Sequence, residues 1–363
     1  MKAVFRALVL IFSCCTFGFQ ANASGSEEHN ESGKYDPVPV IMHHIADSHE
    51  FHIYGEGEES VSMPLPIILY TDGGLVSFLS SEFHHDVEGK TIVDRNGMNF
   101  VNLHDKIYQL EAGATSVKIE DHHPVNASAP LDFSITKNVF SMLMSVLIIL
   151  LVFLSVAKKY KKSNGVPSGL QSFIEPLIVF VRDDVIIPNV GEKKAEKFLP
   201  YLLTVFFFIW FNNLIGLIPF FPFSSNLTGN IAFTMVMAVC TLIITNVNGN
   251  KDYWIHIFNT PGVPWWLKVP IPLMPAVELV GVFAKPFALM VRLFANITAG
   301  HIIILSLVSL IFIFETEYVS LVSVPFVLFM NVLELLVAFL QAYIFTMLTA
   351  LFIGSAVAEH EHH

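Results

Sequence analysis

Several polar side chains lie deep inside long apolar stretches in the C-terminal third of the chain. Arg292 is flanked by Val291 and Leu293 and is the only arginine after Arg182. A charge at the centre of a bilayer costs about 2.5–3.5 kcal/mol on insertion scales. A guanidinium at this depth must therefore face water, a partner or a carboxylate. Its fixed charge suits the control of proton movement better than the making or breaking of covalent bonds.

Two other charged residues precede this arginine at a helical spacing. Glu278, Lys285 and Arg292 are seven residues apart, close to two helical turns, so they line one face of a predicted helix. His301 follows Arg292 by nine residues, about half a turn out of phase and about 13–14 Å further along the axis. Such a helix could separate two aqueous routes, with Arg292 between them.

A matching polar stripe occurs in the last apolar stretch. Asn331, Glu334 and Gln341 are spaced by three and seven residues. Buried polar groups need partners, and antiparallel packing of the two helices would supply them. Imidazole titrates near neutrality, and burial can raise the pKa of a carboxyl group toward it, so His301 and Glu334 are a candidate proton relay. An alternative role, mainly for Asn331 and Gln341, is to hold the helices together by polar contacts without taking part in proton transfer.

The composition places these residues in a membrane protein. Of the 363 residues, 53% are hydrophobic and only 14% are charged, with a mean hydropathy of +0.60. Soluble domains have roughly 25% charged residues. Much of the net charge of -11 belongs to the first half of the chain. The sequence lacks the excess of Lys and Arg over Asp and Glu that is typical of nucleic-acid-binding proteins. These features predict an all-α polytopic membrane protein that binds no nucleic acid.

The apolar segments predict about five membrane helices. They cover residues 139–157, 198–219, 231–247, about 273–314 and about 321–357. The last two would be roughly 55–63 Å long, well beyond the ~30 Å hydrocarbon core. They must therefore tilt strongly, kink at Pro286 or Pro325, or run partly along the membrane. The mixed residues 170–187 predict an amphipathic helix on the cytoplasmic face.

The residues before the first predicted helix form two segments. Residues 1–23 combine a charged start, an apolar core and Ala21-Asn22-Ala23, which predicts a cleaved secretory signal peptide. Residues 24–132 are polar and hold ten of the 15 histidines. Alternating stretches at 67–70 and 99–103 predict a small β-rich extracytoplasmic domain. The histidine pairs lack a diagnostic ligand spacing, so no metal site is predicted.

The charge distribution predicts the orientation of the chain. The first predicted helix ends in the cluster Lys158-Lys159-Tyr160-Lys161-Lys162. Such a cluster marks the cytoplasmic side of a membrane. The mature N-terminus is therefore expected outside, the membrane domain at residues 133–357, and the tail at residues 358–363 in the cytoplasm.

Three motifs resemble subunit a of the F-type ATP synthase membrane sector. They are Ala284-Lys285-Pro286, the run from Arg292 to His301 (RLFANITAGH), and LQAYIF at residues 340–345. The resemblance covers about residues 133–357. It implies a stator subunit with two half-channels, which protonate and deprotonate carboxylates of a c-subunit ring and couple proton flow to ATP synthesis. The implied partners are the c-ring, a b-type peripheral stalk subunit, lipid and the rest of the complex, in a bacterial inner membrane.

The resemblance also implies a role for individual residues. Arg292 corresponds to the stator arginine that faces the c-ring, and Gln341 to an amide close to it. Asn296 matches a polar channel position, and Glu278 a carboxylate near the cytoplasmic outlet. The proton, rather than sodium, is the expected coupling ion, and neither a cofactor nor nucleotide chemistry is expected in this chain.

His301 and Glu334 correspond to a coupled pair in the inlet half-channel. Many bacterial relatives carry Glu at the first position and His at the second, whereas this sequence exchanges them, as mitochondrial-type relatives do. The pair remains one acid and one imidazole, so the predicted relay is kept. Lys285 and Asn331 complete the predicted proton path.

Two other classes of protein remain open from the residues alone. A secondary transporter predicts internal repeats and interrupted helices at mid-membrane, and no repeat is found. A structural membrane anchor would tolerate Arg292→Lys, because charge and length are similar. A stator would not, because a lysine can lose its proton and a guanidinium does not.

Overall fold

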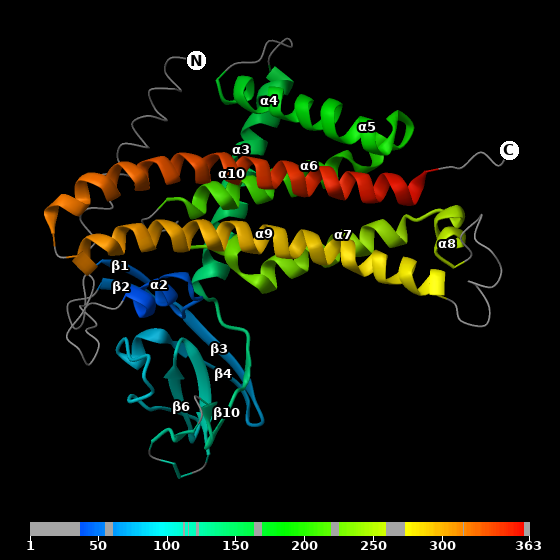
Figure 1. The fold of residues 1–363 in the computed structure, drawn as a ribbon. Helices are drawn as coiled ribbons and strands as arrows, with labels where there is room; N and C mark the ends of the chain where they lie inside the picture. Colours follow the sequence, from blue (N-terminus) through cyan, green and yellow to red (C-terminus); the bar gives the residue numbers. More distant parts are fainter. Residues whose placement is uncertain are drawn as a thin grey trace. The chain divides into compact units, whose positions relative to one another are not determined.

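The computed structural model describes nine stretches of the chain, and most of their residues are helical (Figure 1). They are residues 37–54, 61–111, 113–114, 116–120, 123–162, 169–218, 225–258, 273–314 and 316–358. The predicted signal peptide and nearly all of the predicted tail lie outside these residues. The chain divides into two compact units, residues 1–144 with 215–225 and 302–329, and residues 145–214 with 226–301 and 330–363.

The first unit contains the predicted β-rich segment. Its elements are α2 (Pro37–Ile45), β1 (Glu50–Tyr54), β2 (Val61–Pro64), β3 (Pro66–Thr71), β4 (Gly74–Leu79), η2 (Ser80–Phe83), β5 (Val93–Arg95), β6 (Met98–Leu103), β7 (Lys106–Leu110), β8 (Ile119–Glu120), β9 (His123–Pro124), β10 (Ala127–Ser128) and β11 (Leu131–Asp132). All strand pairs are antiparallel. One sheet has the order β10-β7-β6-β5 and another β11-β3-β4, beside the hairpins β1-β2 and β8-β9.

Alternating side chains build the core of this domain. Ile67 and Leu69 of β3 are fully buried, and Phe78 of β4 packs against Phe100 of β6. Strands with a period of two place one face on the core and the other toward solvent. At the β3–β4 turn, Gly74 adopts a φ of 104°, a conformation that a residue without a Cβ reaches at little cost.

Within the described stretches, four helices are long and apolar enough to cross a membrane. They are α3 (Lys137–Lys162), α6 (Glu192–Gly216), α9 (Leu273–Phe314) and α10 (Glu317–Val357). A fifth span arises if α7 (Ile231–Val247) and α8 (Lys251–Phe258) are counted together, although they meet at 104°. The multi-pass membrane architecture agrees with the prediction, but α8 lies outside the predicted helical ranges.

The predicted amphipathic helix consists of three consecutive helical segments in the second unit. They are α4 (Leu170–Phe180), the π-helical turn η3 (Val181–Ile186) and α5 (Ile187–Val190). Val185 and Ile186 are fully buried, whereas Arg182 and Asp183 are exposed and form an ion pair of 2.7 Å. The segment therefore has one apolar and one charged face.

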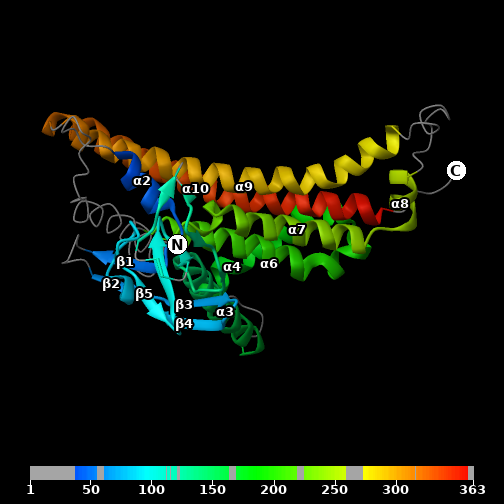
Figure 2. The same cartoon turned by 90° about the horizontal axis from the view of Figure 1, so that it is seen from below.

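Helix α6 forms the core of the second unit. Half of its most apolar window is buried, compared with 17% for α9 and for α10. Phe206 and Phe207 of α6 are buried in a cluster that includes Leu289 of α9 and Phe345 of α10. Figures 1 and 2 show α9 and α10 side by side. Each continues as one helix through its internal proline, and much of its surface is left for lipid or another subunit.

Candidate functional site

Two polar contacts join α9 to α10 within the second unit. Asn296 Nδ2 donates a hydrogen bond of 3.0 Å to Gln341 Oε1, and His301 Nδ1 lies 2.8 Å from Glu334 Oε1. The later residue on α9 contacts the earlier residue on α10, as antiparallel helices require. Apolar residues surround both contacts along the sequence, so the two pairs supply polar partners that lipid could not supply.

The acid–imidazole pair is largely shielded from solvent. The side chain of Glu334 is 6% exposed and that of His301 is 14% exposed. His301 Nδ1 also lies 3.2 Å from the carbonyl oxygen of Ile297, which can only accept a hydrogen bond. Both neighbours of Nδ1 can accept a hydrogen bond, so Nδ1 carries a hydrogen that it can pass to an ionised Glu334, while Nε2 takes up another proton. The arrangement can therefore move a proton between an imidazole and a carboxylate.

Gly300 makes room for Glu334. A Cβ at position 300 would lie only 2.7 Å from Glu334 Oε1 and 3.1 Å from its Cδ. No glycine was singled out from the sequence, because a glycine inside an apolar helix has several explanations. The only available signal was its position directly before His301 in a helical stretch.

Arg292 lies one turn before Asn296 on α9, and its side chain is exposed. It forms no hydrogen bond or ion pair with the residues that the structure describes. Gln341 is 1% exposed, and its Nε2 has no hydrogen-bond partner among the described residues. The intramembrane guanidinium is thus not neutralised by a described carboxylate of its own chain.

Lys285 is exposed two turns before Arg292, as the spacing predicts. Its Nζ lies 5.6 Å from the centre of the Phe352 ring, within range of a cation–π interaction. It also borders a cavity of about 20 Å³, which Thr245, Asn246 and Tyr253 help to line. A cavity of this size holds about one water molecule.

Glu278 and Asn331 remain apart from the two central contacts. Both side chains are half-buried. Neither forms a hydrogen bond or ion pair with another residue in the described stretches. Their proposed places in a proton path therefore depend on sequence position alone.

Asn213 of α6 is a polar residue of this region that the sequence analysis did not select. It is 3% exposed, and its Nδ2 donates a hydrogen bond of 3.1 Å to the backbone oxygen of Ala338. Ala338 lies four residues after Glu334 and three before Gln341, on the same face of α10. An amide inside the predicted span 198–219 was the signal that could have identified it.

The fold and site define a polytopic membrane protein with a shielded acid–imidazole pair and an exposed arginine on one long apolar helix. Comparison with known families identifies the class further. A family model described as ATP synthase A chain matches residues 139–354. The chain belongs to this family, which confirms the sequence-based prediction of a subunit of the proton-translocating ATP synthase. A second model, a domain of unknown function, matches residues 40–133.

Curated relatives agree with the family assignment. A protein of Anaeromyxobacter sp. (strain Fw109-5) is 46% identical over 65% of this chain and 59% of its own length. One of Chlorobium phaeobacteroides (strain BS1) is 50% identical over 64% of this chain and 68% of its own. One of Myxococcus xanthus (strain DK1622) is 43% identical over 70% of this chain and 84% of its own. All three are called ATP synthase subunit a.

Proposed function

We propose that this chain is the stator subunit that carries protons to and from a ring of c subunits in the ATP synthase. It provides two half-channels, one on each side of Arg292, and couples proton flow to rotation and ATP synthesis. Its further partners are a b-type peripheral stalk subunit, lipid and the rest of the complex. The membership in the ATP synthase A chain family supports this proposal.

The exposed side chain of Arg292 is the observation that carries the proposal. A guanidinium keeps its charge in almost any surroundings, and an unpartnered charge at membrane depth is costly. Because α9 and α10 bury so little of their surface, a second subunit can cover the face that carries this arginine. A carboxylate of that subunit would have its pKa lowered as it passes the guanidinium. The same charge repels protons and so blocks a direct leak between the half-channels.

The other polar residues fit the two half-channels. Protons from the extracytoplasmic side pass His301 and Glu334 and neutralise a c-subunit carboxylate. The neutral carboxyl group can rotate through lipid, where a charged one would be penalised. It releases its proton near Glu278 and Lys285 on the cytoplasmic side, and the ionised group then returns past Arg292.

The proposed location is a bacterial inner membrane. The mature N-terminus lies outside the cytoplasm and the C-terminus inside. The lysine cluster at residues 158–162, at the end of α3, supports this orientation, because cytoplasmic flanks of membrane helices are rich in Lys and Arg. Cleavage of residues 1–23 as a signal peptide belongs to the same proposal.

The test uses membrane vesicles that contain the whole complex with Arg292→Ala or Arg292→Lys. We expect both variants to lose coupled ATP synthesis, and Arg292→Ala to increase passive proton leak through the membrane sector. Arg182→Ala is the matched control, since this exposed arginine pairs with Asp183 outside the candidate spans. Normal coupled synthesis with Arg292→Ala would refute the stator role. Full activity with Arg292→Lys would favour a structural anchor.

A further inference from the structure

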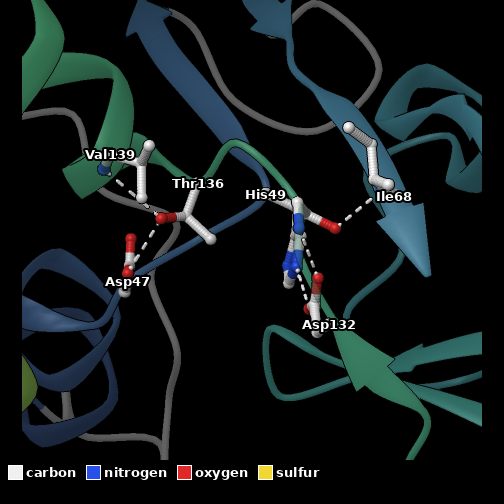
Figure 3. A network of polar contacts seen from close by, with 7 residues as sticks. Asp47, His49, Ile68, Asp132, Thr136 and Val139 are labelled. Carbon is white, nitrogen blue, oxygen red and sulfur yellow. Dashed lines mark hydrogen bonds and ion pairs between the residues drawn. The ribbon is translucent and has the colours of Figure 1, made fainter. Parts of the chain in front are cut away.

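The three residues Asp47, Ser48 and His49 hold the segment that leads into the first membrane helix. They follow α2, whereas their partners lie more than 80 residues later, between residues 132 and 139. Figure 3 shows this network between the domain and the start of α3. All of these residues belong to the first compact unit. We call Asp47–His49 the clasp.

The clasp supplies hydrogen-bond acceptors for the first two N–H groups of α3. The first N–H groups of a helix have no partner within the helix. The backbone N of Lys137 donates to Ser48 O at 2.9 Å, and the N of Asn138 donates to Asp47 Oδ1 at 3.1 Å. The N of Val139 lies 3.4 Å from Thr136 Oγ1. The Thr136 hydroxyl in turn donates to Asp47 Oδ2 at 3.0 Å.

Asp47 thus caps a helix to which it is not adjacent in sequence. A carboxylate at a helix N-terminus is also favoured by the helix dipole. A helix is usually capped by the residue directly before it, which here is Thr136. The additional acceptors from Asp47 and Ser48 tie the cap to the β-rich domain, so the helix start and the domain cannot separate without breaking them.

His49 closes the other end of the clasp. Its Nε2 lies 2.8 Å from Asp132 Oδ2, and the residue is 6% exposed. Asp132 Oδ1 accepts a hydrogen bond from the backbone N of Ser134, whose hydroxyl accepts one from the N of Ile68 in β3. The residues between β11 and α3 are therefore fixed to the sheet as well as to the clasp.

Two further contacts connect the domain and the helix start to other residues of the first compact unit. Phe51, which is fully buried, packs edge-on against Phe140 of α3, with ring centres 6.1 Å apart. The Ser225 hydroxyl donates a hydrogen bond to Asn138 Oδ1. Ser225 follows α6 in sequence and belongs to the same compact unit as Asn138. The residue whose backbone is capped by Asp47 thus also holds a residue that precedes α7.

We propose that the domain matched as a domain of unknown function is a positioning domain, which fixes the start of α3 and, through Asn138, the segment at Ser225. A domain tethered by a flexible linker would leave the N–H groups of the helix start to water. Here the backbone oxygen of Ser48 and the half-buried carboxylate of Asp47, both in the domain, accept hydrogen bonds from the N–H groups of Lys137 and Asn138. The partner of this domain is consequently the start of α3 in its own chain, within the first compact unit.

The test is hydrogen exchange of the intact complex in lipid nanodiscs with Asp47→Ala. Loss of a cap typically changes local stability enough to speed exchange roughly tenfold. We expect this acceleration in peptides that cover residues 137–140 and unchanged exchange in β6. Asp72→Ala is the matched control, since Asp72 is an exposed aspartate of the same domain in the β3–β4 turn.

Two substitutions of His49 test the other end of the clasp. A Gln side chain can place its amide nitrogen where Nε2 lies, whereas the shorter Asn cannot. We expect His49→Gln to keep residues 131–135 protected and His49→Asn to accelerate their exchange several-fold. Unchanged exchange at residues 131–140 in both Asp47→Ala and His49→Asn would overturn the proposal. Equal loss of protection in β6 would also overturn it, because the clasp would then serve the folding of the domain.

Discussion

The substitution Gly300→Ala separates the stability of the helix pair from its proposed proton transfer. The new Cβ would lie 2.7 Å from Glu334 Oε1, whereas ordinary contact begins at 3.4 Å, so the carboxylate must move by about 0.7 Å. Glu334 is buried on the face of α10 that meets α9, and its Oε1 lies 2.8 Å from His301 Nδ1. The displacement therefore falls on the atoms proposed to exchange a proton.

The energetic terms for stability nearly cancel. Alanine is favoured over glycine inside a helix by about 1 kcal/mol. A side chain forced off its rotamer costs about 0.5–1.5 kcal/mol. The obstructing atoms are the end of a flexible Glu334 side chain rather than backbone. We therefore expect Gly300→Ala to assemble almost normally. Misplacement of reacting groups by 1 Å can cost about 100-fold, so proton transport should fall by roughly 10- to 100-fold.

The assay measures ATP-driven proton pumping in inverted vesicles, normalised to the amount of assembled complex. Gly281→Ala is the matched control on the same helix, since a Cβ there would meet nothing within 4 Å. We expect Gly281→Ala to pump like the unmodified complex. Pumping by Gly300→Ala at the rate of Gly281→Ala would refute the relay role of the acid–imidazole pair.

Three further substitutions test the packing and the polar contacts. Gly354→Ala places a Cβ 1.9 Å from the backbone oxygen of Asn189, which cannot move aside, so loss of about 3 kcal/mol or more and of assembled complex is expected in membrane extracts. Asn213→Leu removes the hydrogen bond to Ala338 and should lower the free energy of unfolding by about 1 kcal/mol, measured by chemical denaturation in detergent. Burial raises the pKa of Asp132, but the hydrogen bonds to its carboxylate outweigh burial and lower it below 3.8. Its stabilisation is thus complete above pH 3.8 and lost as the pH falls through the lower pKa, and Asp132→Asn should flatten this acid limb in hydrogen exchange corrected for the intrinsic rate.

Hydropathy and spacing were sufficient to predict most helices, because an apolar stretch in lipid has few alternatives to a helix. The predicted ranges 231–247 and 273–314 coincide with α7 and α9. Helix α6 begins at Glu192, six residues before the predicted start. Its first turns are charged, and the hydropathy pattern marks only the part of a helix that lies in lipid.

Contacts between distant residues were harder to predict. The polar stripes of α9 and α10 predicted that the helices would meet, and the chemistry of His301 and Glu334 predicted that these two would pair. The spacing did not show that Asn296 would contact Gln341. A glycine is needed at position 300 because a Cβ there would lie too close to Glu334 of α10, and this distance is visible only in the structure. Asp47 was not selected either, because a cap supplied from far away in the sequence leaves no local pattern.

The geometry also weighs against a secondary transporter. A transporter that binds an organic solute needs a pocket of roughly 300–1,000 Å³ near the middle of the membrane. The cavity beside Lys285 measures about 20 Å³, enough for a water molecule. On the helix interface, Glu334 and Gln341 are buried and contact His301 and Asn296 of α9. A proton needs no such pocket, since it can pass along hydrogen bonds and single waters. Under the proposed function, the counterpart of the exposed Arg292 is on another subunit rather than on a transported molecule.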